Sequence, residues 1–241
     1  MIQVWLNFFR DKRNVNKSVI TLFLFGFISL VFSYFLTWVE DETRNPYLGQ
    51  FNDPLFFWEP IDFSIPTFLL TYGILGFYII FHLYSPLKII YFIQMLAFIV
   101  FCRIISLTLI QFDAPIPIDP NTGEYLLKVP ANYAGSTMIQ LSDPILNNII
   151  YHKSGIQSSK VIYTHHDLFF SGHTAKCLLA SLLFQNKKIK YFCIILTIIM
   201  ATFLVLQHVH YSIDVIFAPI VTLLTIFLHN KYIKKQKSEI L

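Results

Sequence analysis

Long apolar runs separated by polar connections dominate the pattern of this chain. A helix that crosses a bilayer needs about 20 mostly apolar residues, and six runs approach or exceed that length: 18–39, 64–84, 87–110, 168–184, 191–207 and 210–229. The fourth run is the weakest because it is short and is interrupted by Ser171, His173, Thr174 and Lys176. The pattern predicts an all-α integral membrane protein, a six-transmembrane-helix bundle that forms a single membrane domain over residues 1–241.

Composition agrees with a membrane protein. Of the 241 residues, 55% are hydrophobic and 13% are charged, whereas a soluble domain carries about 25% charged residues. The net charge of +4 is small and divides into local clusters, so we expect no nucleic-acid partner. The three cysteines fall inside apolar runs without metal-ligand or disulfide spacing, and we expect them to be buried apolar side chains.

Lysine and arginine are distributed unevenly over the connections between the runs. Taken alternately from the N-terminus, one side holds twelve of them: Arg10, Lys12, Arg13, Lys17, Lys88, Lys187, Lys188, Lys190, Lys231, Lys234, Lys235 and Lys237. The other side holds four: Arg44, Lys128, Lys153 and Lys160. Because cytoplasmic loops are enriched in Lys and Arg, both termini are predicted to be cytoplasmic. The long connection 112–166 is then extracytoplasmic or lumenal, and we expect it to cover a pocket there.

Two polar fragments lie at the predicted outer ends of the fourth and sixth runs, Ser171-Gly172-His173-Thr174 and His210-Tyr211-Ser212-Ile213-Asp214. His173 and His210 are 37 positions apart, and two helices of about 18 residues, each rising roughly 27 Å, cross the bilayer and return within that length. Both imidazoles are therefore expected at one membrane surface. On a helix, Asp214 shares a face with His210, where it can accept one ring N–H and leave the other nitrogen as a nucleophile.

A single histidine at the mouth of a helix is often only an interfacial residue. Three convergent groups are harder to explain in that way, because Asp214 lies about one turn into an apolar run, where a carboxylate is costly and usually functional. We therefore predict that His173, His210 and Asp214 are catalytic.

Five further residues are candidates for substrate binding. Arg103 lies within a predicted span, and it either binds phosphate bidentately, pairs with Asp167 or Asp214, or only snorkels to the interface. Asp167 either orients a histidine, meets a cationic headgroup amine, or merely precedes the helix. Lys176, one turn beyond His173, either contacts phosphate or snorkels.

Ser171 and Gly172 complete this set. They would allow backbone N–H groups to approach phosphate at a helix N-terminus, where the helix dipole favours anions. His165, His166 and His208 surround the same site, but no metal-ligand spacing such as His-Glu-x-x-His occurs. We therefore expect neither a metal ion nor another cofactor.

These motifs resemble those of the type 2 phosphatidic acid phosphatase superfamily, and more narrowly its sphingomyelin synthase branch. That branch carries Cys-Gly-Asp-x-x-x-Ser-Gly-His-Thr, which corresponds to residues 165–174 with His165-His166 in place of Cys-Gly. Its His-Tyr-Thr-x-Asp-Val corresponds to residues 210–215, with Ser212 in place of threonine. Its arginine near the outer end of helix three, followed by threonine and a Pro-rich turn, corresponds to Arg103 and residues 104–117.

One departure separates the chain from the ordinary lipid phosphatases of this superfamily. Those enzymes carry a Lys-x6-Arg-Pro motif and an arginine six residues before the nucleophilic histidine. No Arg-Pro pair occurs here, and Leu204 stands six residues before His210. The sequence therefore resembles the transferase branch more than the phosphatases.

The resemblance implies a lipid phosphotransferase. It would move phosphocholine or phosphoethanolamine from a glycerophospholipid donor to the hydroxyl of a lipid acceptor such as ceramide. His210 would carry the phosphohistidine, Asp214 would orient His210, and His173 would act first as acid and then as base. Two alternatives remain open. One is a phosphatase or phospholipase C-type hydrolase that uses the same histidines with water as acceptor, and the other is a non-enzymatic lipid-binding membrane protein.

Overall fold

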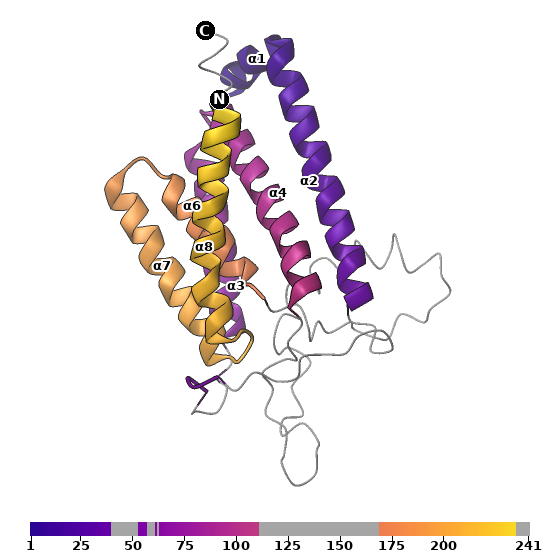
Figure 1. Cartoon of the computed structure of the whole chain (residues 1–241). Coiled ribbons are helices and arrows are strands. Elements are labelled where there is room, and N and C mark those ends of the chain that lie inside the picture. The colour runs from indigo at the N-terminus through magenta and orange to yellow at the C-terminus, as the bar shows by residue number, and fades with distance from the viewer. Residues whose placement is uncertain (40–52, 57–60, 62, 111–168, 235–241) are drawn as a thin grey trace, which may run out of the picture.

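The computed structural model describes residues 1–39, 53–56, 61, 63–110 and 169–234, and within these ranges the chain is helical and has no strand. The predicted loop 112–166 lies outside the described residues. Figure 1 shows the helices, which in chain order are α1 (Ile2–Arg10), α2 (Lys12–Val39), α3 (Ser64–Phe81), α4 (Pro86–Leu109), α6 (Gly172–Leu183), α7 (Lys187–Leu206), α8 (Ser212–Leu228) and the π-helix η2 (His229–Lys234).

Several of these helices are long and apolar enough to cross a membrane. Among the described residues there are four: Lys12–Phe35, Pro86–Leu109, Lys187–Leu206 and Ser212–Tyr232. A shorter apolar helix covers Ile65–Phe81, and α6 has 12 residues, which rise about 18 Å. These helices support a multi-pass integral membrane protein. Six crossings and cytoplasmic termini stay predictions.

The helix boundaries differ from the predicted runs mainly at polar ends. α2 begins at Lys12 rather than at residue 18, and α7 begins at Lys187 rather than at residue 191. Both extensions contain lysine. Lysine favours helix formation, but a search for apolar runs does not include it. Asn186 caps α7, because its Oδ1 accepts hydrogen bonds from the N–H groups of Lys188 and Ile189. α8 begins at Ser212, two residues after the predicted start, so His210 lies in the preceding turn.

The short helix α6 lies in the centre of the bundle. It packs against α3, α4, α7 and α8, and none of its residues is exposed. Ala175, Cys177 and Ala180 are fully buried, and small residues of this kind let helices approach closely in a membrane. The Thr222 hydroxyl of α8 donates to the Ala175 carbonyl at 3.2 Å. Because α6 packs against four other helices, it tolerates the polar residues that made this run the weakest in the sequence.

The outward surfaces of the other helices are apolar. Large exposed hydrophobic side chains occur on α2, α3, α4, α7 and α8, among them Phe23, Ile65, Leu109, Ile198 and Ile216. An exposed apolar surface of this extent is typical of a face that meets lipid.

Hydrogen bonds tie the connections together at each end of the bundle. At the end that holds α1 (Figure 1), Trp5 Nε1 donates to the Leu83 carbonyl at 2.9 Å, and Lys88 Nζ donates to Gln185 Oε1 at 3.2 Å. At the other end, the Ile61 N–H donates to the Leu206 carbonyl at 3.0 Å, and the Ser171 N–H donates to the Asp214 carbonyl at 3.1 Å. The first end thus gathers basic residues that the charge pattern assigns to the cytoplasm.

Candidate functional site

The two histidines singled out in the sequence lie side by side. His173 is on the first turn of α6 and is half-buried, and His210 is in the turn before α8 and is buried. Their ring centroids are 6.4 Å apart, with an angle of 63° between the ring planes. Two imidazoles at this separation can act on a single substrate group placed beside them.

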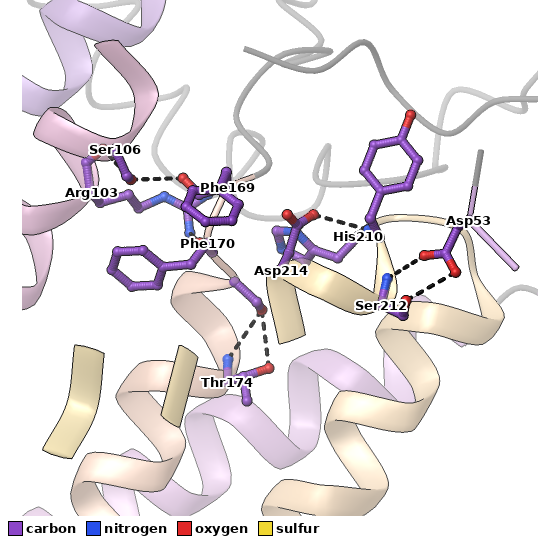
Figure 2. Close-up of polar contacts among 11 residues, drawn as sticks. Asp53, Arg103, Ser106, Phe169, Phe170, Thr174, His210, Ser212 and Asp214 are labelled. Carbon is purple, nitrogen blue, oxygen red and sulfur yellow. Dashed lines mark hydrogen bonds and ion pairs between the residues drawn. The ribbon is translucent and has the colours of Figure 1, made fainter. Parts of the chain in front are cut away.

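Asp214 lies against the His210 ring. Its Oδ2 is 3.5 Å from His210 Nδ1 and accepts a hydrogen bond from the Tyr211 N–H at 2.9 Å. The sequence predicted His210 and Asp214 on one helix, but His210 precedes α8, and Asp214 reaches it as the third residue of that helix. A carboxylate at this position that accepts the N-cap N–H is half of a capping box. Asp214 therefore fixes the start of α8 and faces His210 at the same time (Figure 2).

The two motifs are joined directly. The Ser171 hydroxyl caps α6 by accepting from the Thr174 N–H at 3.3 Å and the Thr174 hydroxyl at 3.0 Å. The Ser171 N–H in turn donates to the Asp214 carbonyl. Because this bond joins the N-termini of α6 and α8, His173 and His210 are held in a fixed relation.

Arg103 of α4 lies at the N-terminus of α6. It is buried, and its Nη1 donates to the Phe170 carbonyl at 2.8 Å. Ser106 donates from the same turn of α4 to the Phe169 carbonyl at 2.8 Å (Figure 2). A Cβ added to Gly172 would overlap the guanidinium and lie 3.2 Å from Arg103 Cζ. The absence of a side chain at Gly172 thus leaves the space that the Arg103 guanidinium occupies. The sequence did not reveal this long-range contact.

The remaining candidates differ in how far the structure places them. Lys176 is half-buried on α6, one turn after His173. Asp167, together with His165 and His166, lies outside the described residues, so its role stays a prediction.

Asp53 is a residue of this region that the sequence analysis missed. Its carboxylate is buried and accepts hydrogen bonds from the Ser212 N–H and, at 2.9 Å, from the Ser212 hydroxyl (Figure 2). It thus anchors the segment 53–56 to the first residue of α8, two positions after His210. An aspartate before a proline was the only local signal, and it does not indicate a contact 159 residues along the chain.

Asp53→Asn is expected to destabilise the fold by about 1–3 kcal/mol, because an amide NH2 group would face one of the two donors of Ser212, and buried bonds to charged groups contribute about this much. Chemical unfolding in detergent micelles, followed by tryptophan fluorescence, measures the change. Asp11→Asn is the matched control, because Asp11 is exposed and its carboxylate accepts the backbone N–H of the nearby Arg13. Equal destabilisation by both substitutions would contradict the anchoring role.

His208 packs beside this anchor. Its ring stacks on Phe56 with centroids 4.1 Å apart, and its backbone has a φ of 54°, in the left-handed region that few residues other than glycine and asparagine adopt. Burial lowers the pKa of the His208 imidazole, although the nearby Asp53 carboxylate opposes the shift. The ring is therefore neutral at pH 7, and we assign it to the packing of this turn.

In the part of the chain that the structure describes, no three His, Cys, Asp or Glu side chains form a group that could hold a metal ion. The expectation of a metal-free site nevertheless stays a prediction, because three of the residues that could contribute ligands, His165, His166 and Asp167, lie outside that part.

Residues 166–231 match the family model described as PAP2 superfamily C-terminal. This segment contains both histidine motifs and the helices α6, α7 and α8 that carry them. The match supports the predicted resemblance of this chain to the type 2 phosphatidic acid phosphatase (PAP2) superfamily. It suggests a lipid phosphatase or phosphotransferase type of function. No curated protein and no solved structure matches the chain.

Proposed function

We propose that this protein is a membrane lipid phosphotransferase of the sphingomyelin synthase type. It moves a phospho-headgroup from a glycerophospholipid to the hydroxyl of a second lipid such as ceramide. The observation that carries the proposal is the 6.4 Å separation of the His173 and His210 rings, with Asp214 3.5 Å from His210 Nδ1. A nucleophile, an orienting carboxylate and a second proton-transfer group are the parts that covalent phosphoryl transfer requires.

In the first half-reaction, His210 Nε2 attacks the phosphorus of the donor lipid. A nitrogen–phosphorus bond forms, and the bond from phosphorus to the diacylglycerol oxygen breaks. His173 supplies the proton that the departing oxygen needs, so diacylglycerol leaves as a neutral alcohol. Asp214, whose Oδ2 lies 3.5 Å from Nδ1 of His210, stabilises the positive charge that develops on the ring.

In the second half-reaction, the hydroxyl of the acceptor lipid attacks the phosphohistidine. His173, now neutral, takes the hydroxyl proton, a new oxygen–phosphorus bond forms and the nitrogen–phosphorus bond breaks. His210 returns to its starting state, and His173 is again protonated for the next donor. General acid–base help of this kind contributes about 10²–10⁴-fold to the rate.

The surroundings of Arg103 support a phosphate site. The N-terminus of α6 offers backbone N–H groups and the positive end of a helix dipole, both of which favour anions. The Arg103 guanidinium lies against Gly172 at this point, and a guanidinium is well shaped to bind two phosphate oxygens. The donor phosphate would therefore bind between Arg103, the start of α6 and the two histidines.

Gly172→Ala is expected to lower the rate of lipid product formation by about 10²-fold, the scale of a 1 Å misplacement in a site. The new methyl group would displace the guanidinium, which is the movable end of a long side chain, so the fold should remain intact. Gly73→Ala is the matched control, because a Cβ there meets nothing within 4 Å. Steady-state rates with a labelled phospholipid donor and unfolding midpoints measure the two effects. An unchanged rate would remove Arg103 from the proposed phosphate site.

Leu204 supports transfer rather than simple phosphatase chemistry. The lipid phosphatases of the superfamily carry an arginine six residues before the nucleophilic histidine, and Leu204 stands at that position here. Its side chain is buried in the apolar core. This chain would therefore contact phosphate without that arginine. We further propose that the site faces the extracytoplasmic or lumenal side, because the opposite end of the bundle carries most of the basic residues.

A product analysis tests the proposal. Purified full-length protein is incubated with labelled phosphatidylcholine or phosphatidylethanolamine, with and without ceramide, and the lipids are separated. A labelled sphingophospholipid that forms only with ceramide supports transfer. Labelled phosphocholine, phosphoethanolamine or inorganic phosphate in both incubations would instead make the protein a hydrolase. No labelled product with any donor would refute an enzymatic role.

A further inference from the structure

A large crevice lies at the end of the bundle away from His173 and His210. It has a volume of about 1180 Å³ and is lined by residues of α2, α4, α8 and η2. Figure 1 shows these helices reaching the end of the bundle that holds α1. This volume is larger than that of typical small-ligand pockets, which measure about 300–1,000 Å³. The crevice is therefore large enough for a ligand the size of a lipid.

The mouth of the crevice is polar and positively charged. Arg13 and Lys17 on the first turns of α2 line it, and Lys17 Nζ lies 3.8 Å from the centroid of the Tyr91 ring. Asp11 also lines the mouth, but its carboxylate accepts the Arg13 backbone N–H. Aromatic and basic side chains together are typical of the headgroup level of a membrane.

A chain of hydrogen bonds crosses the crevice below this mouth. Gln94 Nε2 donates to Thr21 Oγ1 at 2.8 Å, and Gln94 Oε1 lies 3.3 Å from His229 Nε2. These three residues belong to α2, α4 and η2, so the chain ties together the three walls of the crevice.

The deeper part of the crevice is apolar. Its lining includes Leu24, Ile28, Met95, Phe98 and Phe101. From Leu87 to Phe101 the crevice follows α4 for about 21 Å, at a rise of 1.5 Å per residue. One leaflet contributes half of the hydrocarbon core of ~30 Å, so this length fits the acyl chains of one leaflet with part of the headgroup layer.

We propose that this crevice binds one anionic glycerophospholipid from the leaflet at the N-terminal end of the bundle. The lipid phosphate lies at Lys17 and Arg13, and the acyl chains lie along Leu24, Ile28 and Phe98. Charge complementarity selects an anionic headgroup, because each interfacial Lys or Arg adds to the affinity for anionic lipid. The site is distinct from the histidine site, since Arg103 and His210 are not among the residues that line it.

Native mass spectrometry of the full-length protein in detergent tests this site, with dioleoylphosphatidylglycerol as the anionic probe and dioleoylphosphatidylcholine as the zwitterionic one. The wild-type protein should retain one phosphatidylglycerol at concentrations where it retains no phosphatidylcholine. The double variant Arg13→Gln/Lys17→Gln should bind phosphatidylglycerol about thirtyfold more weakly, the effect expected for two interfacial cations, and should bind phosphatidylcholine as before.

The matched control is Lys187→Gln/Lys188→Gln, which removes the same charge from exposed positions on α7. It should leave the affinity for phosphatidylglycerol within threefold of the wild-type value. Leu24→Trp fills the apolar part without changing the charge and should weaken the retention of both lipids. Equal loss of phosphatidylglycerol in the two charge variants would overturn the proposal, because it would show attraction to surface charge alone. The absence of any preference for phosphatidylglycerol in the wild-type protein would overturn it as well.

Discussion

His210→Gln should reduce lipid product formation by more than about 10⁴-fold, because removal of the nucleophile from enzymes with covalent intermediates costs rates on this scale. Glutamine keeps similar volume and polarity in a buried position, so the fold should persist. The same variant should yield no labelled phosphoprotein when the wild-type protein, quenched in alkali during turnover, yields one. Product formation and phosphoprotein trapping together measure the effect.

His82→Gln is the matched control for this experiment. His82 is also buried, but it lies at the opposite end of the bundle, where its Nδ1 is 3.0 Å from the Tyr78 carbonyl oxygen. It should retain transfer close to the wild-type rate. A His210→Gln protein that is folded and keeps more than a few per cent of the activity would refute a phosphohistidine on His210.

His173→Gln should slow transfer from a natural phospholipid by about 10²–10⁴-fold, the usual contribution of a general acid–base group. The loss should depend on the donor. A lipid analogue that releases nitrophenolate needs no proton on its leaving group, so the first half-reaction should be largely restored for it. Burst-phase measurement of nitrophenolate release separates that half-reaction from the second one.

The second half-reaction still needs a base for the acceptor hydroxyl, so steady-state turnover of the analogue should remain slow in His173→Gln. An equal loss of burst rate with the natural donor and the analogue would show that His173 only positions the substrate. Thr202→Ala is a suitable control on α7, because the Thr202 hydroxyl is exposed and donates only to the Ile198 carbonyl within its own helix.

The apolar runs predicted the long helices well, because a segment that crosses the lipid must be both mostly apolar and helical. α4 differs from its predicted range by one residue at each end, and α3 begins at the predicted residue. α1 was not predicted, since nine residues with mixed polarity give no spanning signal. α6 was the uncertain run for a physical reason, because a helix enclosed by protein does not have to be apolar.

The site was predictable where its residues are close in sequence or at equivalent ends of helices. Alternate crossings predicted that His173 and His210 lie at the same end, and the structure brings their rings together. The residue at which α8 begins was harder to predict from the sequence, because the capping contact of Asp214 with the Tyr211 N–H depends on local geometry. The contacts of Asp53 with Ser212 and of Arg103 with Gly172 join distant segments, and no periodicity in the chain encodes such pairs.

The enclosure of α6 has a consequence for how the protein is made. On insertion scales a lysine at the centre of a spanning helix costs about 2.5–3.5 kcal/mol, and α6 carries Lys176 and His173 on 12 residues. Such a segment is a poor substrate for the translocon on its own. The apolar α7 follows after three residues, so the two should integrate as a hairpin, and α6 should settle only when its neighbours have already assembled. Assembly of the candidate site and completion of membrane biogenesis would then be the same event.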